Sequence, residues 1–276
     1  MMKSSTSKMK ISKISTFFIL AVITVLILIT TTTLSKGSKD KNNSLRQSPP
    51  IAVVELFTSE GCSSCPPADR LASQIYKSYK SQNKPVFVLA FHVDYWDYIG
   101  WKDRFAKHEF SERQHLYGEK FNLRSIYTPQ MIVNGTTQFV GSDSEAAENA
   151  IKDVLKTNSQ YGISMEVSWV DSKQLKIKYS LTSAPENAVI NIALVEKNLS
   201  TDVKRGENSG RKLEHDNVVR EFDTSIAKEK SERKLRVAED INLTNSTLIA
   251  YVQDKNSFKI LGAVSSSLPT QNKEKF

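Results

Sequence analysis

The sequence predicts an α/β domain over residues 51–157 followed by an antiparallel β-sandwich domain over residues 158–268. In the first region short apolar runs alternate with helical stretches, which is the pattern of an α/β unit. In the second region apolar and polar residues alternate with a period of two, and short segments of this kind separated by turns indicate a sandwich. The chain has 276 residues, 39% hydrophobic and 25% charged, which fits a globular protein of about two domains.

The basic charge of the chain is concentrated at its N-terminus. The formal net charge is +8, but the first 47 residues hold eight lysines and arginines against one acid, Asp40, and so carry +7 of it. The remaining 229 residues are nearly neutral. A body without a basic surface is not suited to nucleic acid, so we expect no nucleic-acid partner.

The N-terminal part divides into a basic region over residues 1–13, an apolar segment over residues 14–34 and a polar linker over residues 35–50. The strongest apolar part, residues 17–29, has the length of a secretory signal. With the threonines that follow it, the segment reaches about 20 residues, enough to span a membrane once. The sequence leaves open whether it is a cleaved signal peptide or a transmembrane anchor. In both cases the leading lysines predict an extracytoplasmic body, secreted or periplasmic after cleavage.

The elements of the α/β domain can be followed along the chain. Residues 51–57 (IAVVELF) are apolar and rich in β-branched side chains, which predicts a buried strand. Two prolines then precede a predicted helix over residues 68–81, because proline is tolerated in the first turn. The further predicted elements are a strand over residues 86–93, a helix over residues 102–121, the short strands QMIVNG and TQFVGS, and a helix over residues 143–156.

In the sandwich domain the predicted strands are apolar runs between turn signals such as DSK and DKNS. After the last of them, residues 269–276 are predicted to be a frayed tail. The predicted strands cover residues 163–169, 175–181, 189–195, 218–222, 248–252 and 258–264.

The two cysteines of the protein, Cys62 and Cys65, lie in the motif GCSSCP between the first predicted strand and the first predicted helix. A disulfide in such a turn can open and reform by thiolate attack. The helix N-terminus favours the thiolate of the leading cysteine, so we expect Cys62 to attack and Cys65 to resolve the mixed disulfide. The pair can instead be a permanent structural disulfide, as is common outside the cytoplasm. Zinc would need a second pair of ligands that is missing, and we expect no metal site and no cofactor.

A second candidate feature is the dipeptide Thr128-Pro129 before the predicted strand QMIVNG. An X-Pro bond can adopt the cis form, and the preceding residue can then present its backbone to an extended polypeptide. Thr128 is therefore a candidate substrate-binding residue.

Four segments carry a resemblance: VELFTSEGCSSCPPAD, LAFHVDYWDYIGWKD, YTPQMIVNG and RGENSGRKLEHDNVVR. They resemble the secreted thioredoxin-like proteins of domain-of-unknown-function family 1223. The resemblance implies a thioredoxin-like fold for residues 51–157, redox positions for Cys62 and Cys65, and the cis-proline position for Pro129. The family has no settled activity. The Ser-Ser dipeptide matches neither the Gly-Pro of reductive thioredoxins nor the histidine of oxidising relatives, so the resemblance carries no reduction potential over to this chain.

Thioredoxin-like enzymes often bury an acid beneath the disulfide to take the proton of the resolving thiol, and Glu55 in the first predicted strand is the candidate for this role. It lies seven positions before Cys62. This spacing is one residue longer than in thioredoxin, so the side chain would point elsewhere unless the loop absorbs the extra residue.

An aromatic loop, HVDYWDYIGW, follows the second predicted strand at its carboxyl end, where open α/β sheets bind ligands. His92, Asp94 and Trp96 are therefore candidates for a substrate-docking rim. The aromatic residues can equally fill a seam between the two domains. His92 can be a hydrogen-bonded structural residue, a proton donor, or a third copper ligand beside the two thiolates.

Together these features predict an extracytoplasmic protein resembling a thiol-disulfide oxidoreductase. Its expected partners are the thiols and disulfides of envelope or secreted proteins, and the membrane if the N-terminal segment is not cleaved. Two alternatives stay open: a copper-binding or delivery module using Cys62, Cys65 and His92, and a non-catalytic adaptor with a structural disulfide. The second-half motifs RGEN and HDN are predicted to be hairpin turns, and the sequence assigns them no chemical role.

Overall fold

The computed structural model describes residues 48–271, which belong to one compact unit of the chain. The predicted basic region, the apolar segment, nearly all of the linker and the end of the tail lie outside this range. Within residues 48–271 there is no helix long and apolar enough to cross a membrane. The signal peptide or anchor over residues 14–34 therefore stays a prediction.

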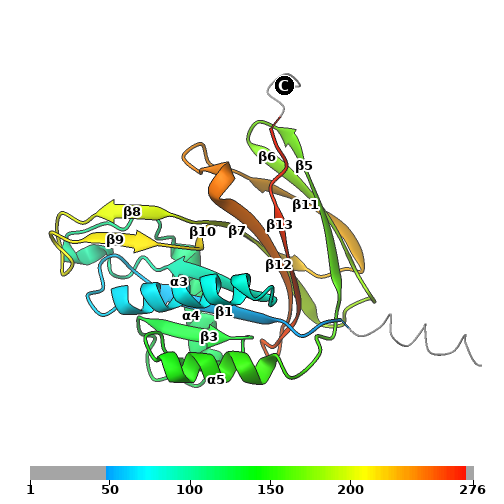
Figure 1. The fold of residues 1–276 in the computed structure, drawn as a ribbon, viewed down its shortest axis with the longest axis horizontal. Helices are drawn as coiled ribbons and strands as arrows, with labels where there is room; N and C mark the ends of the chain where they lie inside the picture. The colour runs from blue at the N-terminus through cyan, green and yellow to red at the C-terminus, as the bar shows by residue number, and fades with distance from the viewer. Residues whose placement is uncertain (1–47, 272–276) are drawn as a thin grey trace, which may run out of the picture. The chain divides into compact units, whose positions relative to one another are not determined.

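A mixed sheet of eight strands, contributed by both halves of the chain, is the main feature of the fold (Figure 1). Its strands are β1 (Ala52–Thr58), β2 (Val86–His92), β3 (Gln130–Val133), β4 (Thr137–Val140), β7 (Ala188–Glu196), β10 (Val218–Ile226), β12 (Ser246–Asp254) and β13 (Ile260–Ser267). The order across the sheet is β13-β12-β7-β10-β2-β1-β3-β4. β1 is parallel to β2 and antiparallel to β3, so the region around residues 51–157 is a mixed α/β arrangement, as the sequence predicts.

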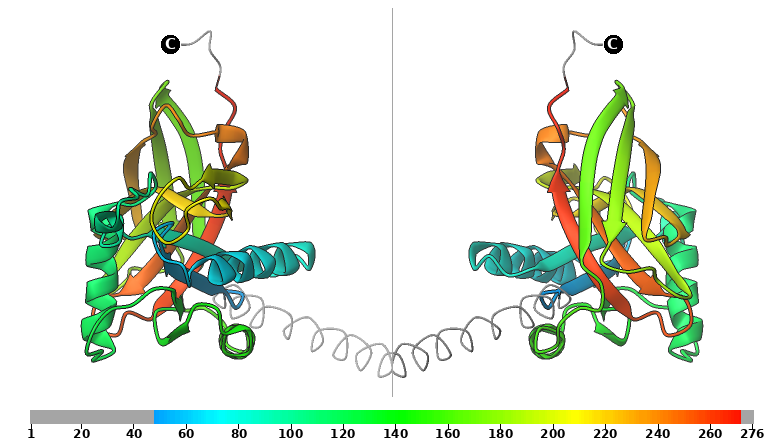
Figure 2. Two further views of the ribbon diagram at one scale, coloured as in Figure 1. Left: turned by 90° about the vertical axis from the view of Figure 1, so that its left-hand side faces the viewer. Right: turned by 90° about the vertical axis from the view of Figure 1, so that its right-hand side faces the viewer.

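Three helices cover the β1–β4 part of the sheet: α3 (Pro66–Ser81), α4 (His108–Lys120) and α5 (Ser144–Val154). α3 and α5 lie on one face and α4 lies on the other (Figure 2). The predicted prolines do begin α3, and the Asp143 side chain caps α5 by accepting the N–H of Ala146. α4 begins at His108 rather than near residue 102, because Asp103 accepts the N–H of Phe105 and holds this stretch in a loop.

The side chains of β1 alternate between these two faces, as expected for a strand. Val54 and Leu56 pack against α3 and α5, whereas Val53 and Phe57 pack on the side of α4. All seven residues of β1 are buried, because helices cover both faces. This alternation decides which functional side chains can meet.

A separate antiparallel sheet of three strands packs face to face on the second-half strands of the large sheet. Its strands are β5 (Ile163–Asp171), β6 (Gln174–Leu181) and β11 (Lys230–Arg236). Leu175 and Ile177 of β6 share one hydrophobic core with Ile190 of β7 and Leu248 of β12. The period-two pattern therefore did indicate antiparallel strands with one buried face.

The large sheet continues across the boundary that the sequence predicts between residues 157 and 158. The junction is a parallel contact between β10 and β2, in which Val218 lies opposite Ala90 and the N–H of Ala90 donates to the carbonyl of Asn217 at 2.9 Å. β2 would otherwise leave an unpaired edge, and β10 covers part of it. The second half is therefore built onto the first through shared backbone hydrogen bonds.

A third, two-stranded sheet lies near the start of α3. Its strands are β8 (Leu199–Asp202) and β9 (Lys212–His215), and β9 contacts α3. The described part also contains two short 3-10 helices, η1 (Asp97–Ile99) and η2 (Leu243–Asn245). β8, β9 and β11 are absent from the sequence prediction because their residues are mostly polar and few of them are buried.

Candidate functional site

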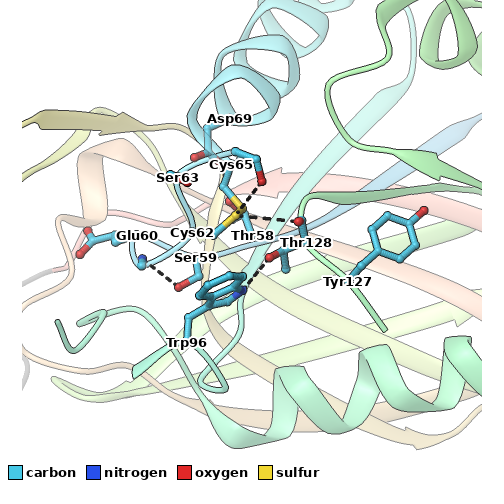
Figure 3. The surroundings of a disulfide bond; sticks show 12 residues. Thr58, Ser59, Glu60, Cys62, Ser63, Cys65, Asp69, Trp96, Tyr127 and Thr128 are labelled. Carbon is cyan, nitrogen blue, oxygen red and sulfur yellow. Dashed lines mark hydrogen bonds between the residues drawn. A yellow bond between two sulfur atoms is a disulfide. The ribbon is translucent and has the colours of Figure 1, made fainter. Parts of the chain in front are cut away.

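Cys62 and Cys65 form a disulfide between the end of β1 and the start of α3 (Figure 3). Their Cα atoms are 5.4 Å apart, and Cys65 is the N-cap residue of α3. Cys62 is 1% exposed and Cys65 is 0% exposed, whereas Ser63 and Ser64 between them face solvent. The cysteine pair therefore lies beneath an exposed dipeptide, and exposure alone does not identify which cysteine attacks.

The residues predicted to face the cysteines are next to them. The Thr128–Pro129 peptide bond is cis. The carbonyl oxygen of Thr128 lies 3.9 Å from the sulfur of Cys62. Trp96 donates from Nε1 to Oγ1 of Thr128 at 2.7 Å, which holds the indole against this loop (Figure 3). The fold thus brings five predicted site residues together: Cys62, Cys65, Thr128, Pro129 and Trp96.

A loop between β8 and β9 completes the site from the other half of the chain. Asn208 is fully buried, and its side-chain Nδ2 donates to the carbonyls of Glu60 and Cys62 at 2.9 Å each. Beside it, the Glu207 carboxylate accepts the N–H of Ser63 at 3.0 Å. The sequence predicts that these two residues lie in a hairpin turn. The clue to a role at the site is that RGEN belongs to one of the four segments that resemble the family.

Glu55 is not brought to the disulfide. It lies on the α4 face of β1, together with Phe57, while the cysteines adjoin α3 on the opposite face. The loop does not absorb the extra residue. Instead Glu55 accepts hydrogen bonds from Arg113 at 2.7 Å, from Tyr251 at 2.7 Å and from Tyr117.

These residues and Gln253 form a buried network that we call the Glu55 cluster: Glu55, Arg113, Tyr117, Tyr251 and Gln253. Burial lowers the pKa of Arg113, but the Glu55 carboxylate and the oxygens of Tyr251 and Tyr117 together outweigh burial and raise this pKa overall. Burial also raises the pKa of Tyr117 and of Tyr251. The cluster therefore holds one charged pair between two neutral phenols, and it links β1 and α4 to β12.

His92 lies in a second buried group, on the α3 face. Its Nδ1 is 2.6 Å from Oδ2 of Asp103, and its ring packs against that of His215 with centroids 5.0 Å apart. Nε2 of His215 is 3.4 Å from Oε1 of Glu60, and its Nδ1 is 3.9 Å from Oδ2 of Asp69. We call these five residues the His92 cluster: Glu60, Asp69, His92, Asp103 and His215.

Burial and mutual charge shift the titration of the His92 cluster. Burial lowers the pKa of His92. The carboxylates of Asp103, Asp69 and Glu60 outweigh the effect of burial, so the pKa of His92 is raised overall. Burial raises the pKa of Asp69, the residue that accepts a hydrogen bond from Thr58 at 2.8 Å. Asp69 and His215 also line a polar cavity of about 450 Å³.

Asp94 is not part of the disulfide site. Its backbone N–H donates to Ser111 at 3.1 Å and its carboxylate lies 3.1 Å from Nδ1 of His108, so it supports the first turn of α4. Burial raises the pKa of Asp94. Hydrogen bonds from Ser111 and His108 outweigh the effect of burial, so the pKa of Asp94 is lowered overall.

The copper alternative finds no support in the geometry. Nδ1 of His92 is held by Asp103, and although its Nε2 has no hydrogen-bond partner, the ring packs against Phe105 and His215. Across residues 48–271 no group of three or more histidine, cysteine, aspartate and glutamate side chains is arranged to hold a metal ion.

Comparison with known proteins places the chain in a family. The family model described as "Protein of unknown function (DUF1223)" matches residues 53–253. The chain belongs to the DUF1223 family. The match runs from β1 to β12, so the family unit includes the disulfide, the cis proline and the loop that carries Asn208.

Solved structures show similarity to this DUF1223 protein as well. An X-ray structure of a protein from Agrobacterium tumefaciens has a TM-score of 0.62 and 25% identity, over 82% of this chain and 98% of that chain. A domain of the outer membrane lipoprotein Omp28 from Porphyromonas gingivalis gives a TM-score of 0.27 at 12% identity, over 41% of this chain and 92% of that chain. A β-glucuronidase from Ruminococcus gnavus gives a TM-score of 0.23 at 10% identity, over 41% of this chain and 16% of that chain. The last two TM-scores are too low to indicate a shared fold. No curated protein matches the chain.

Proposed function

We propose that this DUF1223 protein is an extracytoplasmic thiol-disulfide oxidoreductase with a thioredoxin-like active site. The observation that carries the proposal is the Cys62–Cys65 disulfide at the N-terminus of α3, with the cis Thr128–Pro129 bond beside it. A reversible disulfide at a helix N-terminus is suited to exchange, because the unpaired N–H groups stabilise a thiolate. The backbone of Thr128 is the proposed docking edge for a substrate polypeptide.

In the reducing direction the Cys62 thiolate attacks a sulfur of the substrate disulfide and forms a mixed disulfide, and the other substrate sulfur leaves as a thiolate. Cys65 then attacks the sulfur of Cys62, which releases the second substrate thiolate. The protein dithiol is oxidised to the disulfide, and the substrate gains two electrons and two protons. The opposite direction is the same sequence reversed, and the proposal does not depend on which one operates.

Asp69 takes, in this proposal, the proton-accepting role that the sequence analysis gave to Glu55. It lies in the first turn of α3 and its N–H donates to the carbonyl of Cys65 at 3.1 Å. Burial raises its pKa, which brings the carboxyl closer to the range in which it can exchange protons with a thiol. Glu55 cannot serve, since both of its oxygens already accept hydrogen bonds within the Glu55 cluster.

The second candidate is an adaptor with a permanent disulfide. The near-complete burial of both cysteines favours it, because a partner sulfur must approach along the S–S axis. The two candidates differ in whether the disulfide ever opens in the living cell.

Trapping in cells separates the two candidates. The full-length Cys65→Ser variant should accumulate mixed disulfides with envelope or secreted proteins, because the resolving thiol is missing. These adducts are visible after acid quenching, alkylation and non-reducing electrophoresis. The matched control is the variant with both cysteines replaced by serine, which should form none. If Cys65→Ser forms no adduct, and the wild-type pair is always oxidised, the oxidoreductase proposal is wrong and the adaptor remains.

A further inference from the structure

Glu207 lies at the cysteine pair although it is 145 positions beyond Cys62 in the chain. Its Oε2 accepts the backbone N–H of Ser63, the residue that directly follows Cys62, at 3.0 Å. Glu207 itself is exposed to solvent. Hydrogen bonds from the side chain and the backbone of Ser63 lower its pKa, so the carboxylate is ionised at neutral pH.

The position of Glu207 is set by the residues on either side of it. Asn208 donates to the carbonyls of Glu60 and Cys62 at 2.9 Å, and Arg211 donates to Oδ1 of Asn208 at 3.0 Å. Gly206 has a φ of +75°, and a Cβ there would lie 3.2 Å from Cβ of Trp101. The loop between β8 and β9 is therefore anchored on the backbone of Glu60 and Cys62, and it holds the Glu207 carboxylate beside the N–H of Ser63.

The N–H groups that follow the leading cysteine are the groups that would stabilise its thiolate. Glu207 occupies one of them in the oxidised protein. When the pair is reduced, a thiolate at Cys62 would have to compete with the Glu207 carboxylate for the N–H of Ser63, and the two negative charges would repel each other.

We propose that Glu207 is a positioning residue that restrains the reactivity of Cys62 by occupying this N–H group. The inference rests on the proposed function, since it concerns the reduced form of the pair. Disfavouring the thiolate destabilises the dithiol relative to the disulfide, so Glu207 makes the pair a weaker oxidant. The second half of the chain thereby tunes the redox centre of the first half.

Other charged groups surround the cysteine loop and stay in place in the test. Glu60 and Asp69 lie beneath it in the His92 cluster, and Arg211 adjoins Asn208. Glu214, an exposed residue of β9 on the same segment, is the matched control, because it has the same charge and lies opposite Ser200 of β8.

The test measures the alkylation rate of Cys62 in the full-length protein with Cys65→Ser, from about pH 5 to 10. Glu207→Gln removes the charge, and Glu207→Ala also frees the N–H. We expect both to lower the pKa of the Cys62 thiol and to raise alkylation below that pKa about two- to fivefold. The gain should shrink in 1 M salt, because Glu207 is exposed. With both cysteines present, the same changes should raise the reduction potential measured in glutathione buffers.

Equal pH profiles for Glu207→Gln, Glu207→Ala and the unchanged protein would overturn the inference, as would an equal shift in Glu214→Gln. Both replacements are at an exposed side chain, so loss of folding is not expected to interfere. The proposed function fails separately: it depends on trapped partners in cells, whereas this measurement needs only the purified protein. A shifted profile, together with no trapped partner and a wild-type pair that is always oxidised in cells, would uphold the role of Glu207 and refute the oxidoreductase.

Discussion

Two buried ionic clusters tie the halves of the chain together, and they differ in how well their atoms are satisfied. In the Glu55 cluster no buried polar side-chain atom lacks a hydrogen-bond partner. In the His92 cluster Oε1 of Glu60, Nε2 of His92 and both ring nitrogens of His215 have none. A satisfied buried network stabilises one conformation, whereas unpaired buried polar atoms cost free energy. The satisfied cluster lies away from the disulfide, and the unsatisfied one lies beneath it.

Removing one partner of the Glu55 cluster should have the largest effect on stability. Arg113→Met leaves the Glu55 carboxylate buried and uncompensated, and we expect a loss of about 3–5 kcal/mol in the free energy of unfolding. Urea denaturation measures this. Arg236→Met on β11 is the control, since Arg236 is exposed and should change little. Adding Glu55→Gln to Arg113→Met should recover part of the loss. A loss below about 1 kcal/mol would show that the cluster is not a stabilising unit.

The His92 cluster should make stability depend on pH. The pKa of His92 is raised above 6.5 in the folded state, so the folded protein keeps a proton that the unfolded chain has released. The free energy of unfolding should therefore be highest below about pH 6.5 and fall as the pH rises through the raised pKa. The raised pKa of Asp69 also makes the free energy of unfolding fall with rising pH, beginning above about pH 3.8. Each unit of pKa difference contributes about 1.4 kcal/mol.

His92→Asn is the variant that tests this dependence. The amide can still donate to Asp103 in place of Nδ1, but it does not titrate. Denaturation at pH 5, 7 and 9, with the disulfide kept oxidised, should give a flatter profile than that of the wild type. His108→Asn, at a side chain that is 76% exposed, is the control. An unchanged slope in His92→Asn would assign the pH dependence to another group.

The smallest expected effect comes from a local hydrogen bond that belongs to neither cluster. The side chain of Asp143 caps α5 by accepting the N–H of Ala146 at 2.9 Å, and Asp143→Ala removes this cap. We expect a loss of about 1 kcal/mol in the free energy of unfolding, without a change in the slope against pH above 6. Asp143→Asn should restore most of it, since asparagine caps helices equally well. A loss as large as that of Arg113→Met would mean that the buried clusters contribute no more to the free energy of unfolding than an exposed helix cap does.

Several parts of the fold and site could be predicted because their signals are local. The β-branched run before GCSSC, the proline pair at the start of α3 and the dipeptide Thr128-Pro129 each act within a few residues. The direction of Glu55 could not be predicted, because it depends on how the loop before Cys62 handles one extra residue. Its partners Arg113 and Tyr251 lie 58 and 196 positions away.

The sequence by itself determined the positions of the cysteines, the order of most strands and helices, and the change from α/β to period-two patterning, because these follow from chain neighbours and from burial. Only the tertiary structure decided that β10 pairs with β2, that Asn208 and Glu207 hold the cysteine loop, and that Asp69 rather than Glu55 lies on the side of the disulfide. The reason is physical. Hydrogen bonds between residues so far apart in the chain leave no periodicity in the sequence, and they form only when the sheet brings both halves together.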